Sequence, residues 1–289
     1  MVDKQADWTS HDIVAKVRGL LRQSVSQGLE SGASHEDKVQ GTGEKQSEHY
    51  KRYSERASEP VTQQFASRQS RVAGSARKQD LAVRSPRVKV GHTGTLDPFA
   101  TGLLILVVGS YTKRAQEFSG MDKTYEAEMV LGATSTTGDP EGEITQLPTL
   151  PTDRQATNYQ LPSQNDIEAV FSQFKGTQMQ MPHKYSAKKV NGQKAYNLAR
   201  AGKDVKLEPK EITVHSLKLT AYSYPSVKFT AKVSSGTYIR SLAEDIGAKL
   251  GTGAYLSSLR RTSVGDYSVE DALLLDQLPE NIALHIQST

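Results

Sequence analysis

The first helix is predicted by apolar residues that recur at helical spacing near the start of the chain. Thr9 and Ser10 precede them, and either residue can cap a helix N-terminus. The apolar positions follow one face of an α-helix and are Ile13, Val14, Val17, Leu20 and Leu21. We expect a helix that begins near residue 10 and ends near residue 22.

Residues 23–86 show no sustained hydrophobic period. They are rich in Ser, Gln, Glu, Lys, Arg and Gly, and such a composition buries too little apolar surface to offset its ordering entropy. Lengthening a loop from about three to about sixty-five residues costs roughly 2.5–3 kcal/mol of closure entropy, which a folded domain tolerates. We expect a polar, largely disordered insertion, so that the folded body is discontinuous and comprises residues 1–22 and 87–270.

Strand patterns are spread over the second part of the chain. Leu103–Val108 is a continuous apolar run, which is typical of a buried strand. Residues 125–131 and 227–233 alternate apolar and polar side chains, as half-buried strands do. Residues 136–163 are rich in Gly, Pro, Thr and Asp and are expected to be mainly connection.

Helical spacing recurs between these strands. Helices are expected around 112–119, around 167–174 and from Ile239 to Leu250, where Gly251 marks the end. Strands and helices mix without a regular βαβ rhythm. The fold class predicted is therefore α+β with a mixed, mostly antiparallel sheet flanked by helices and loops.

Composition narrows the class of protein. The chain has 289 residues, no cysteine and a formal net charge of +4, so disulfides and thiolate metal sites are excluded. No apolar run is long enough to span a bilayer, and the N-terminus lacks the apolar core of a signal peptide. The seven histidines are scattered, so no metal site is expected. We expect a cytoplasmic protein.

The candidate chemistry begins with Asp97, the acid of a glycine-punctuated turn at residues 91–102. Glycines around one carboxylate indicate a sharply bent backbone that admits a close approach. Asp97 followed by Pro98 is also a common helix start, with the aspartate as N-cap. The two interpretations are compatible, because a cap geometry would hold the carboxylate at the end of the turn.

Arg240 is the second candidate, because it falls in the first turn of a predicted helix, where the dipole disfavours a cation. It needs an anion there, and Asp97 would suit; an arginine within hydrogen-bonding range lowers a carboxylate's pKa by about 1–3 units. Alternatively, Arg240 is a surface residue whose stem merely packs. Tyr125 can either stack on a base or fill the core.

Several segments together resemble one known family, the TruB pseudouridine synthases of bacterial type. The block Gly-His-Thr-Gly-Thr-Leu-Asp-Pro at 91–98 is the most specific, and the order and approximate spacing match over nearly all of the chain outside 23–86. The matching segments are Thr9–Val14, Gly91–Gly102, Lys123–Tyr125, Gln180–Ala187 with Gly192–Tyr196, Ser235–Leu242 and Leu259–Arg261.

The resemblance implies the pseudouridine synthase fold and an isomerase that converts uridine-55 in the T-arm loop of tRNA to pseudouridine without a cofactor. The target uridine must leave its stack to reach a buried carboxylate. Asp97 would be the essential aspartate, whether it attacks the sugar, attacks the base or abstracts a sugar proton. By similarity, support would come from a stacking Tyr125, an Arg240 paired with Asp97, a His92 that props the vacated position, and the pocket residues Tyr238 and Leu259.

The implied partner is tRNA, with no membrane, guide RNA or obligatory protein partner. Basic side chains would grip its phosphates and contribute salt-dependent affinity without reading bases. The candidate RNA-binding residues are Lys184, Lys188, Lys189, Lys194, Arg200, Lys203, Arg260 and Arg261.

The chain departs from the family pattern at both ends. Only Lys4 remains of the usual Lys-Pro-x-Gly element, and residues 271–289 are expected to form a short tail without the C-terminal PUA domain of many relatives. Two alternatives stay open. One is an RNA-binding tRNA folding factor with secondary catalysis; the other is the guide-dependent dyskerin branch, which the segment Pro182–Tyr196 and the missing PUA domain disfavour.

Overall fold

The computed structural model describes residues 1–31, 88–147, 161–186, 188–190, 192–194, 201, 207–278 and 282. The chain divides into two compact units, one comprising residues 1–24 with 87–289 and the other comprising residues 25–86. Most of the insertion expected at 23–86 lies outside the described residues.

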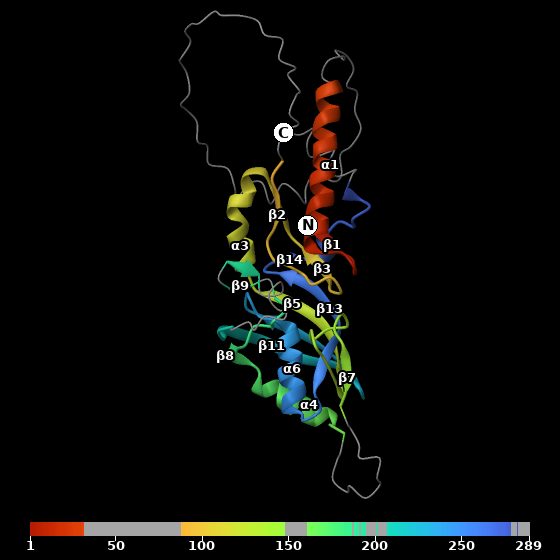
Figure 1. Ribbon diagram of the computed structural model, residues 1–289, viewed down its shortest axis with the longest axis vertical. Coiled ribbons are helices and arrows are strands. Elements are labelled where there is room, and N and C mark those ends of the chain that lie inside the picture. The colour runs from red at the N-terminus through yellow and green to blue at the C-terminus, as the bar shows by residue number, and fades with distance from the viewer. Residues whose placement is uncertain are drawn as a thin grey trace, which may run out of the picture. The chain divides into compact units, whose positions relative to one another are not determined.

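The first unit is built around a mixed eight-stranded sheet (Figure 1). Its strand order is β1-β3-β13-β5-β12-β11-β8, with β14 paired to β13. Every pair is antiparallel except β3 with β13, which confirms the expected α+β class. The strands are β1 Val2–Lys4, β3 Thr101–Leu104, β5 Lys123–Leu131, β8 Gly176–Gln180, β11 Lys210–Ser223, β12 Ser226–Val233, β13 Ala254–Val264 and β14 Tyr267–Ser268.

The described residues also form three two-stranded ribbons: β2 (Val90–His92) with β4 (Leu106–Val108), β6 (Ala133–Ser135) with β7 (Ile144–Gln146), and β9 (Lys189–Val190) with β10 (Gln193–Lys194). The single strand expected at 103–108 is therefore wrong. The chain leaves the main sheet after β3 and pairs with β2 through β4. Both short strands contribute buried side chains, which explains why the apolar run is continuous.

Helix α1 (Ser10–Ser31) begins where the sequence predicts and continues past the expected end. Thr9 and Asp12 form the cap: the Asp12 N–H donates to Thr9 Oγ1 at 3.1 Å and the Thr9 N–H donates to Asp12 Oδ2 at 2.9 Å. No helix in the described parts of the chain is long and apolar enough to cross a membrane.

Helices α4 (Gln164–Gln173) and α6 (Ile239–Lys249) contact each other, and each also packs on a strand of the sheet, β11 and β13 respectively (Figure 1). Their buried residues join those of β5, β11, β12 and β13 in the main core. The helix expected around 112–119 is present as a 3-10 turn η1 (Gly109–Arg114) followed by α3 (Ala115–Ser119); a second 3-10 turn, η2, spans Val269–Asp271.

Candidate active site

Asp97 lies in an irregular turn between β2 and β3, and no helix follows it. The Ala100 N–H donates to the Asp97 carbonyl at 3.1 Å, and β3 begins one residue later. The expected Asp-Pro helix start is therefore wrong. Ser10 orders the turn instead, because its Oγ accepts from the Leu96 N–H at 2.9 Å and donates to the Leu96 carbonyl at 3.1 Å.

Lys4 anchors the other side of this turn. Its side chain is fully buried, and its ammonium donates to the carbonyls of Gln5 and Pro98, both at 2.9 Å, and to the carbonyl of Ala100. Burial lowers the pKa of Lys4 to about 8, while the Asp97 carboxylate acts in the opposite direction. The remaining lysine of the N-terminal element thus fixes the backbone that carries Asp97.

Arg261, on β13, contacts the chain on both sides of the Asp97 turn. Its Nε donates to the Leu103 carbonyl at 2.8 Å and its Nη2 donates to the Gly94 carbonyl at 3.1 Å. Gly102 has a φ of +101°, and a Cβ there would collide with the backbone of Arg261. The glycine expected to allow a close approach therefore admits a neighbouring strand.

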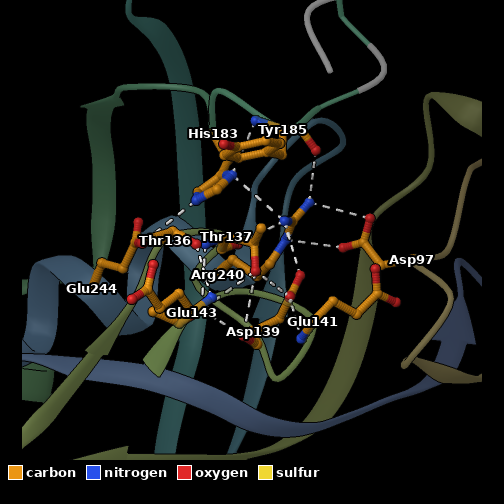
Figure 2. Close-up of polar contacts among 11 residues, drawn as sticks. Asp97, Thr136, Thr137, Asp139, Glu141, Glu143, His183, Tyr185, Arg240 and Glu244 are labelled. Carbon is orange, nitrogen blue, oxygen red and sulfur yellow. Dashed lines mark hydrogen bonds and ion pairs between the residues drawn. The ribbon is translucent and has the colours of Figure 1, made fainter. Parts of the chain in front are cut away.

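Arg240 and Asp97 form the predicted ion pair (Figure 2). Arg240 Nε lies 3.0 Å from Asp97 Oδ2, and Nη2 donates to Asp97 Oδ1 at 3.2 Å. The guanidinium is only 5% exposed, so the alternative of a surface arginine is wrong. Arg240 sits in the first turn of α6, and the two-point contact fixes the orientation of the carboxylate.

The inner edge of the Arg240 guanidinium meets a second carboxylate, that of Asp139. Nη1 donates to Asp139 Oδ2 at 3.0 Å and to the Thr137 carbonyl at 2.8 Å, while Nη2 donates to the Tyr185 carbonyl at 3.1 Å. Every N–H of the guanidinium therefore has an acceptor. Asp139 also accepts from Thr137 Oγ1 and from the Glu141 N–H, which fixes its carboxylate independently of Arg240.

The two carboxylates differ in exposure, and this difference assigns their chemistry. The Asp139 side chain is 3% exposed, whereas that of Asp97 is 33% exposed. Burial raises the pKa of Asp97, Asp139 acts in the same direction, and Arg240 opposes both. The expectation that Arg240 lowers the pKa of Asp97 below its ordinary value is therefore wrong, because the effect of burial is larger than the opposing effect of the guanidinium. Only Asp97 is available to a ligand.

Asp97 and Arg240 line a cavity of about 270 Å³. Of the candidate support residues, Tyr125, Tyr238 and Leu259 line it as well. Tyr238 is clamped by Gln180, whose amide donates to the Tyr238 carbonyl at 3.0 Å and accepts from the Tyr238 N–H at 2.9 Å. The full lining is Thr93, Gly94, Thr95, Leu96, Asp97, Ser119, Lys123, Tyr125, Ser186, Lys188, Ser234, Gly236, Thr237, Tyr238, Ile239, Arg240, Leu259 and Arg261.

His92 is a candidate that the structure does not bring to this cavity. Its ring lies edge-on to His11, with ring centroids 5.3 Å apart, and it is absent from the cavity lining among the described residues. No group of three or more metal-binding side chains occurs among the same residues.

The candidate RNA-binding residues fall into three groups. Lys184 is exposed, and Lys188 lines the cavity and donates to the Glu208 carbonyl at 3.2 Å. Arg260 pairs with Asp3 at 2.7 Å, and Arg261 is 2% exposed at the wall of the cavity. An RNA-binding role for these two arginines stays a prediction. The positions of Arg200 and Lys203, and the side chains of Lys189 and Lys194, lie outside the described residues.

Three buried polar residues of the site escaped sequence reasoning: Asp139, His183 and Lys4 in its anchoring role. Asp139 lies within 136–163, which was expected to be mainly connection. A signal was present, since Thr137, Gly138 and Asp139 form a turn-rich sequence, but nothing in it points to Arg240. Only the folded chain joins residues so far apart.

Comparison with known proteins identifies the family. A model described as "TruB family pseudouridylate synthase (N terminal domain)" matches residues 78–239, and one described as "tRNA pseudouridylate synthase B C-terminal domain" matches residues 240–288. The protein named tRNA pseudouridine synthase B in Cupriavidus metallidurans is 45% identical over 205 residues, covering 69% of this chain and 62% of the relative. That of Burkholderia lata is 44% identical over 205 residues, covering 70% and 61%. The chain thus spans about three fifths of the length of these relatives.

Solved structures agree on the fold. A Cbf5-Nop10-Gar1 complex contains a chain similar to this one at a TM-score of 0.56 and 20% identity, covering 99% of this chain and 55% of that one. An archaeal box H/ACA sRNP Nop10-Cbf5 complex gives 0.54 and 19%, covering 99% and 54%. With the Asp97 turn, its arginine and the mixed sheet in place, the matches lead to one conclusion: the chain belongs to the TruB family of pseudouridylate synthases.

Proposed function

We propose that this protein isomerises uridine to pseudouridine in tRNA, at position 55 of the T-arm loop, and that Asp97 carries the chemistry. The proposal is supported by the family and by relatives named tRNA pseudouridine synthase B. The observation that carries it is the Asp97 carboxylate, one third exposed and held by a buried arginine at the wall of a cavity. A reactive acid must be oriented by the protein and reached by the substrate, and Asp97 satisfies both requirements.

The cavity dimensions favour a single extruded nucleotide. At about 270 Å³ the cavity lies just below the usual range for small-molecule sites, roughly 300–1,000 Å³. A uridine inside a folded T-loop would have to flip out to enter it, at a cost of a few kcal/mol of lost stacking. The ring of Tyr125 and the side chain of Leu259 supply apolar surfaces on which a flipped base could rest.

Arg240 and Asp139 act on Asp97 rather than on the base. The guanidinium is held by Asp139, Thr137 and Tyr185, so it cannot follow Asp97 when the carboxylate moves. A fixed arginine leaves the carboxylate few alternative rotamers and stabilises its ionised form. Asp97 can then act either as a nucleophile or as a base during cleavage of the glycosidic bond.

The reaction itself requires no co-substrate. Uridine and pseudouridine are isomers: the bond from ribose to the base nitrogen is broken, the base turns, and a bond to carbon replaces it. No atom or electron is exchanged with a second molecule except the hydrogen displaced from that carbon. We therefore propose that the chain works on tRNA without a cofactor, a guide RNA or an obligatory protein partner.

The test uses the full chain and a transcribed tRNA labelled with tritium at C5 of uridine, because forming the new carbon bond displaces that hydrogen. We expect tritium release from whole tRNA and from a bare T-arm stem-loop, with modification mapped to position 55. Asp97→Asn should abolish release, while Asp122→Asn, at a carboxylate outside the cavity lining, should not. Equal release by the Asp97 variant would contradict the proposal, and release that requires an added guide RNA would favour the guide-dependent alternative.

A further inference from the structure

His183 is a buried titratable residue for which the proposed function has no role. It follows β8 (Gly176–Gln180) by three residues and is 8% exposed. Its ring does not line the cavity among the described residues, so it is not in position to touch a base there. The ring faces Arg240 on one side and Glu244 on the other (Figure 2).

The neighbours of the ring define its tautomer. Nδ1 accepts from the Tyr185 N–H at 3.2 Å and lies 3.5 Å from Arg240 Nη1, which has only protons to offer. Nε2 lies 3.4 Å from Glu244 Oε1, an acceptor. The Tyr185 N–H at Nδ1 and the carboxylate at Nε2 point to a neutral ring that carries its proton on Nε2 and a lone pair on Nδ1.

We propose that His183, held in this tautomer by Glu244, is a positioning residue that fixes the Arg240 guanidinium for its work on Asp97. The inference rests on the proposed function. Both protons of Arg240 Nη1 already go to Asp139 and the Thr137 carbonyl, at 3.0 and 2.8 Å, so the unprotonated Nδ1 that lies 3.5 Å away acts on Arg240 mainly through Tyr185. The same Nδ1 orders Tyr185, whose carbonyl accepts from Arg240 Nη2 at 3.1 Å.

The His183–Glu244 pair also supports the turn that carries Asp139. A Cβ added to Gly138 would lie 2.9 Å from Glu244 Oε1 and 3.2 Å from His183 Nε2, so the turn packs directly on the pair. Gly138 has a φ of +70°, a conformation that favours glycine. The His183–Glu244 pair therefore supports two groups that accept hydrogen bonds from Arg240: Asp139, through the turn at Gly138, and the Tyr185 carbonyl.

This arrangement makes a specific prediction for the ring. Losing the acceptor at Nδ1 frees the segment at Tyr185 and lets the guanidinium shift, while the lining residues outside this segment, such as Tyr125 and Leu259, stay in place. A displacement of about 1 Å at a reacting group can cost about 100-fold in rate. The effect should therefore fall on kcat and leave KM for tRNA nearly unchanged.

The test compares four variants in single-turnover and steady-state tritium release. His183→Leu should lower kcat by about tenfold to 100-fold with KM within about twofold of wild type. His183→Asn should recover most of the rate, because its amide oxygen can accept in place of Nδ1. Glu244→Gln keeps an acceptor for Nε2 and should be nearly as active as wild type. His215→Leu is the matched control, since His215 pairs with Asp122 at 3.0 Å away from the cavity, and it should retain wild-type kcat.

A second readout does not depend on activity. Nitrogen-15 NMR of the full chain should give His183 a protonated Nε2 and an unprotonated Nδ1 at neutral pH. A protonated Nδ1, or a His183→Leu variant with wild-type kcat, would overturn the proposal. An inactive wild-type chain would contradict the proposed function instead, and the tautomer would then decide separately whether the pair exists. If His183→Leu does not fold, the recovery by His183→Asn and the NMR signal still decide.

Discussion

Arg240 and Asp97 meet in a two-point ion pair although 143 positions separate them in the chain. The pair joins the first turn of α6 to the turn before β3, two segments that the fold brings together through β13, which pairs with β3 and packs against α6. Asp139 continues the arrangement on the far side of the guanidinium at 3.0 Å. One arginine thus serves an accessible carboxylate and a buried one, and the two should respond differently to mutation.

Asp97→Asn should remove activity without weakening the fold. Burial raises the pKa of Asp97, so its ionised form is disfavoured in the folded state. The protonated carboxyl therefore stabilises the folded chain relative to the unfolded one, and this stabilisation is lost as pH rises through the folded pKa. At pH 7 the amide removes that unfavourable charge while Arg240 keeps Asp139 as its partner. We expect turnover to fall by about 10⁴-fold or more, with a melting temperature equal to or above that of wild type. A clear drop in melting temperature would contradict this reasoning.

Asp139→Asn should behave in the opposite way. Its carboxylate is 3% exposed and accepts from Arg240, Thr137 and the Glu141 N–H. Removing its charge leaves Nη1 of a buried arginine with a weaker acceptor, which should cost about 1–3 kcal/mol of unfolding free energy. Turnover should also fall, because the guanidinium loses its rear support. Denaturant titrations of both aspartate variants under the same conditions measure the contrast, and equal stability would exclude it.

The pH dependence of turnover should report Asp97. Since Arg240 lowers the pKa of Asp97 against the effect of burial, removing the guanidinium must raise that pKa further. A higher pKa means a smaller ionised fraction at any acidic pH. The acidic limb of the kcat/KM profile should therefore move to higher pH in Arg240→Met, and less in Arg240→Lys, which keeps a positive charge. A limb that stays in place in both variants would show that Asp97 does not control it.

Sequence patterns predicted the fold class because alternation is clear where strands are regular. Residues 125–131 and 227–233 alternate cleanly, and both lie in central strands, β5 and β12. The long strands β11 and β13 were not predicted. Their ladders contain register shifts, in β13 between Leu256 and Ser258 and between Arg261 and Ser263, and each shift breaks the period of two. The alternation that would have predicted β11 and β13 is therefore interrupted in the sequence of both strands.

The candidate site was predicted in its acid and its arginine but not in what surrounds them. Asp97 and Arg240 each stand in a local context that needs explanation: a glycine-rich turn and a helix N-terminus. Asp139 lies in a segment that looks like ordinary connection, and its burial follows only from the tertiary contact with Arg240. His92 lies beside His11 and outside the cavity lining among the described residues, and its role at the position that the flipped uridine vacates stays a prediction.

Lys4→Met tests the anchor of the Asp97 turn. The folded pKa of Lys4 is lowered from 10.5 to about 8, so between these values the unfolded chain binds a proton that the folded chain does not. Stability contributed by such a group rises with pH across that window. The free energy of unfolding of wild type relative to Lys4→Met should therefore increase from pH 8 to pH 10. A difference that stays constant over this range would contradict the lowered pKa. Turnover should be reduced at pH 7, because the carbonyls of Pro98 and Ala100 lose their donor.

Removing residues 25–86 tests whether the proposed catalytic domain is discontinuous. The first unit retains α1 up to Ser24, and Arg18 Nη2 donates to the Val90 carbonyl at 3.1 Å, which sets the helix beside β2. Ser24 follows Arg18 by about 9 Å along the helix axis. A Gly/Ser linker of about twelve residues, which spans up to about 40 Å when extended, replaces the deleted segment between Ser24 and Arg87. We expect this deletion to keep the thermal transition and the turnover on a T-arm stem-loop.

The matched control for this deletion removes residues 18–86 and inserts the same linker. It takes away the Arg18 contact with Val90 and also Leu20 and Leu21, which pack against the core cluster formed by α1, β1 and β2. Losing these apolar contacts should lower the free energy of unfolding by several kcal/mol, since burying one leucine contributes about 1.5–3 kcal/mol. If both deletions unfold alike, residues 25–86 are part of the folding unit; if only the longer one does, the catalytic domain is made of two separate segments of the chain.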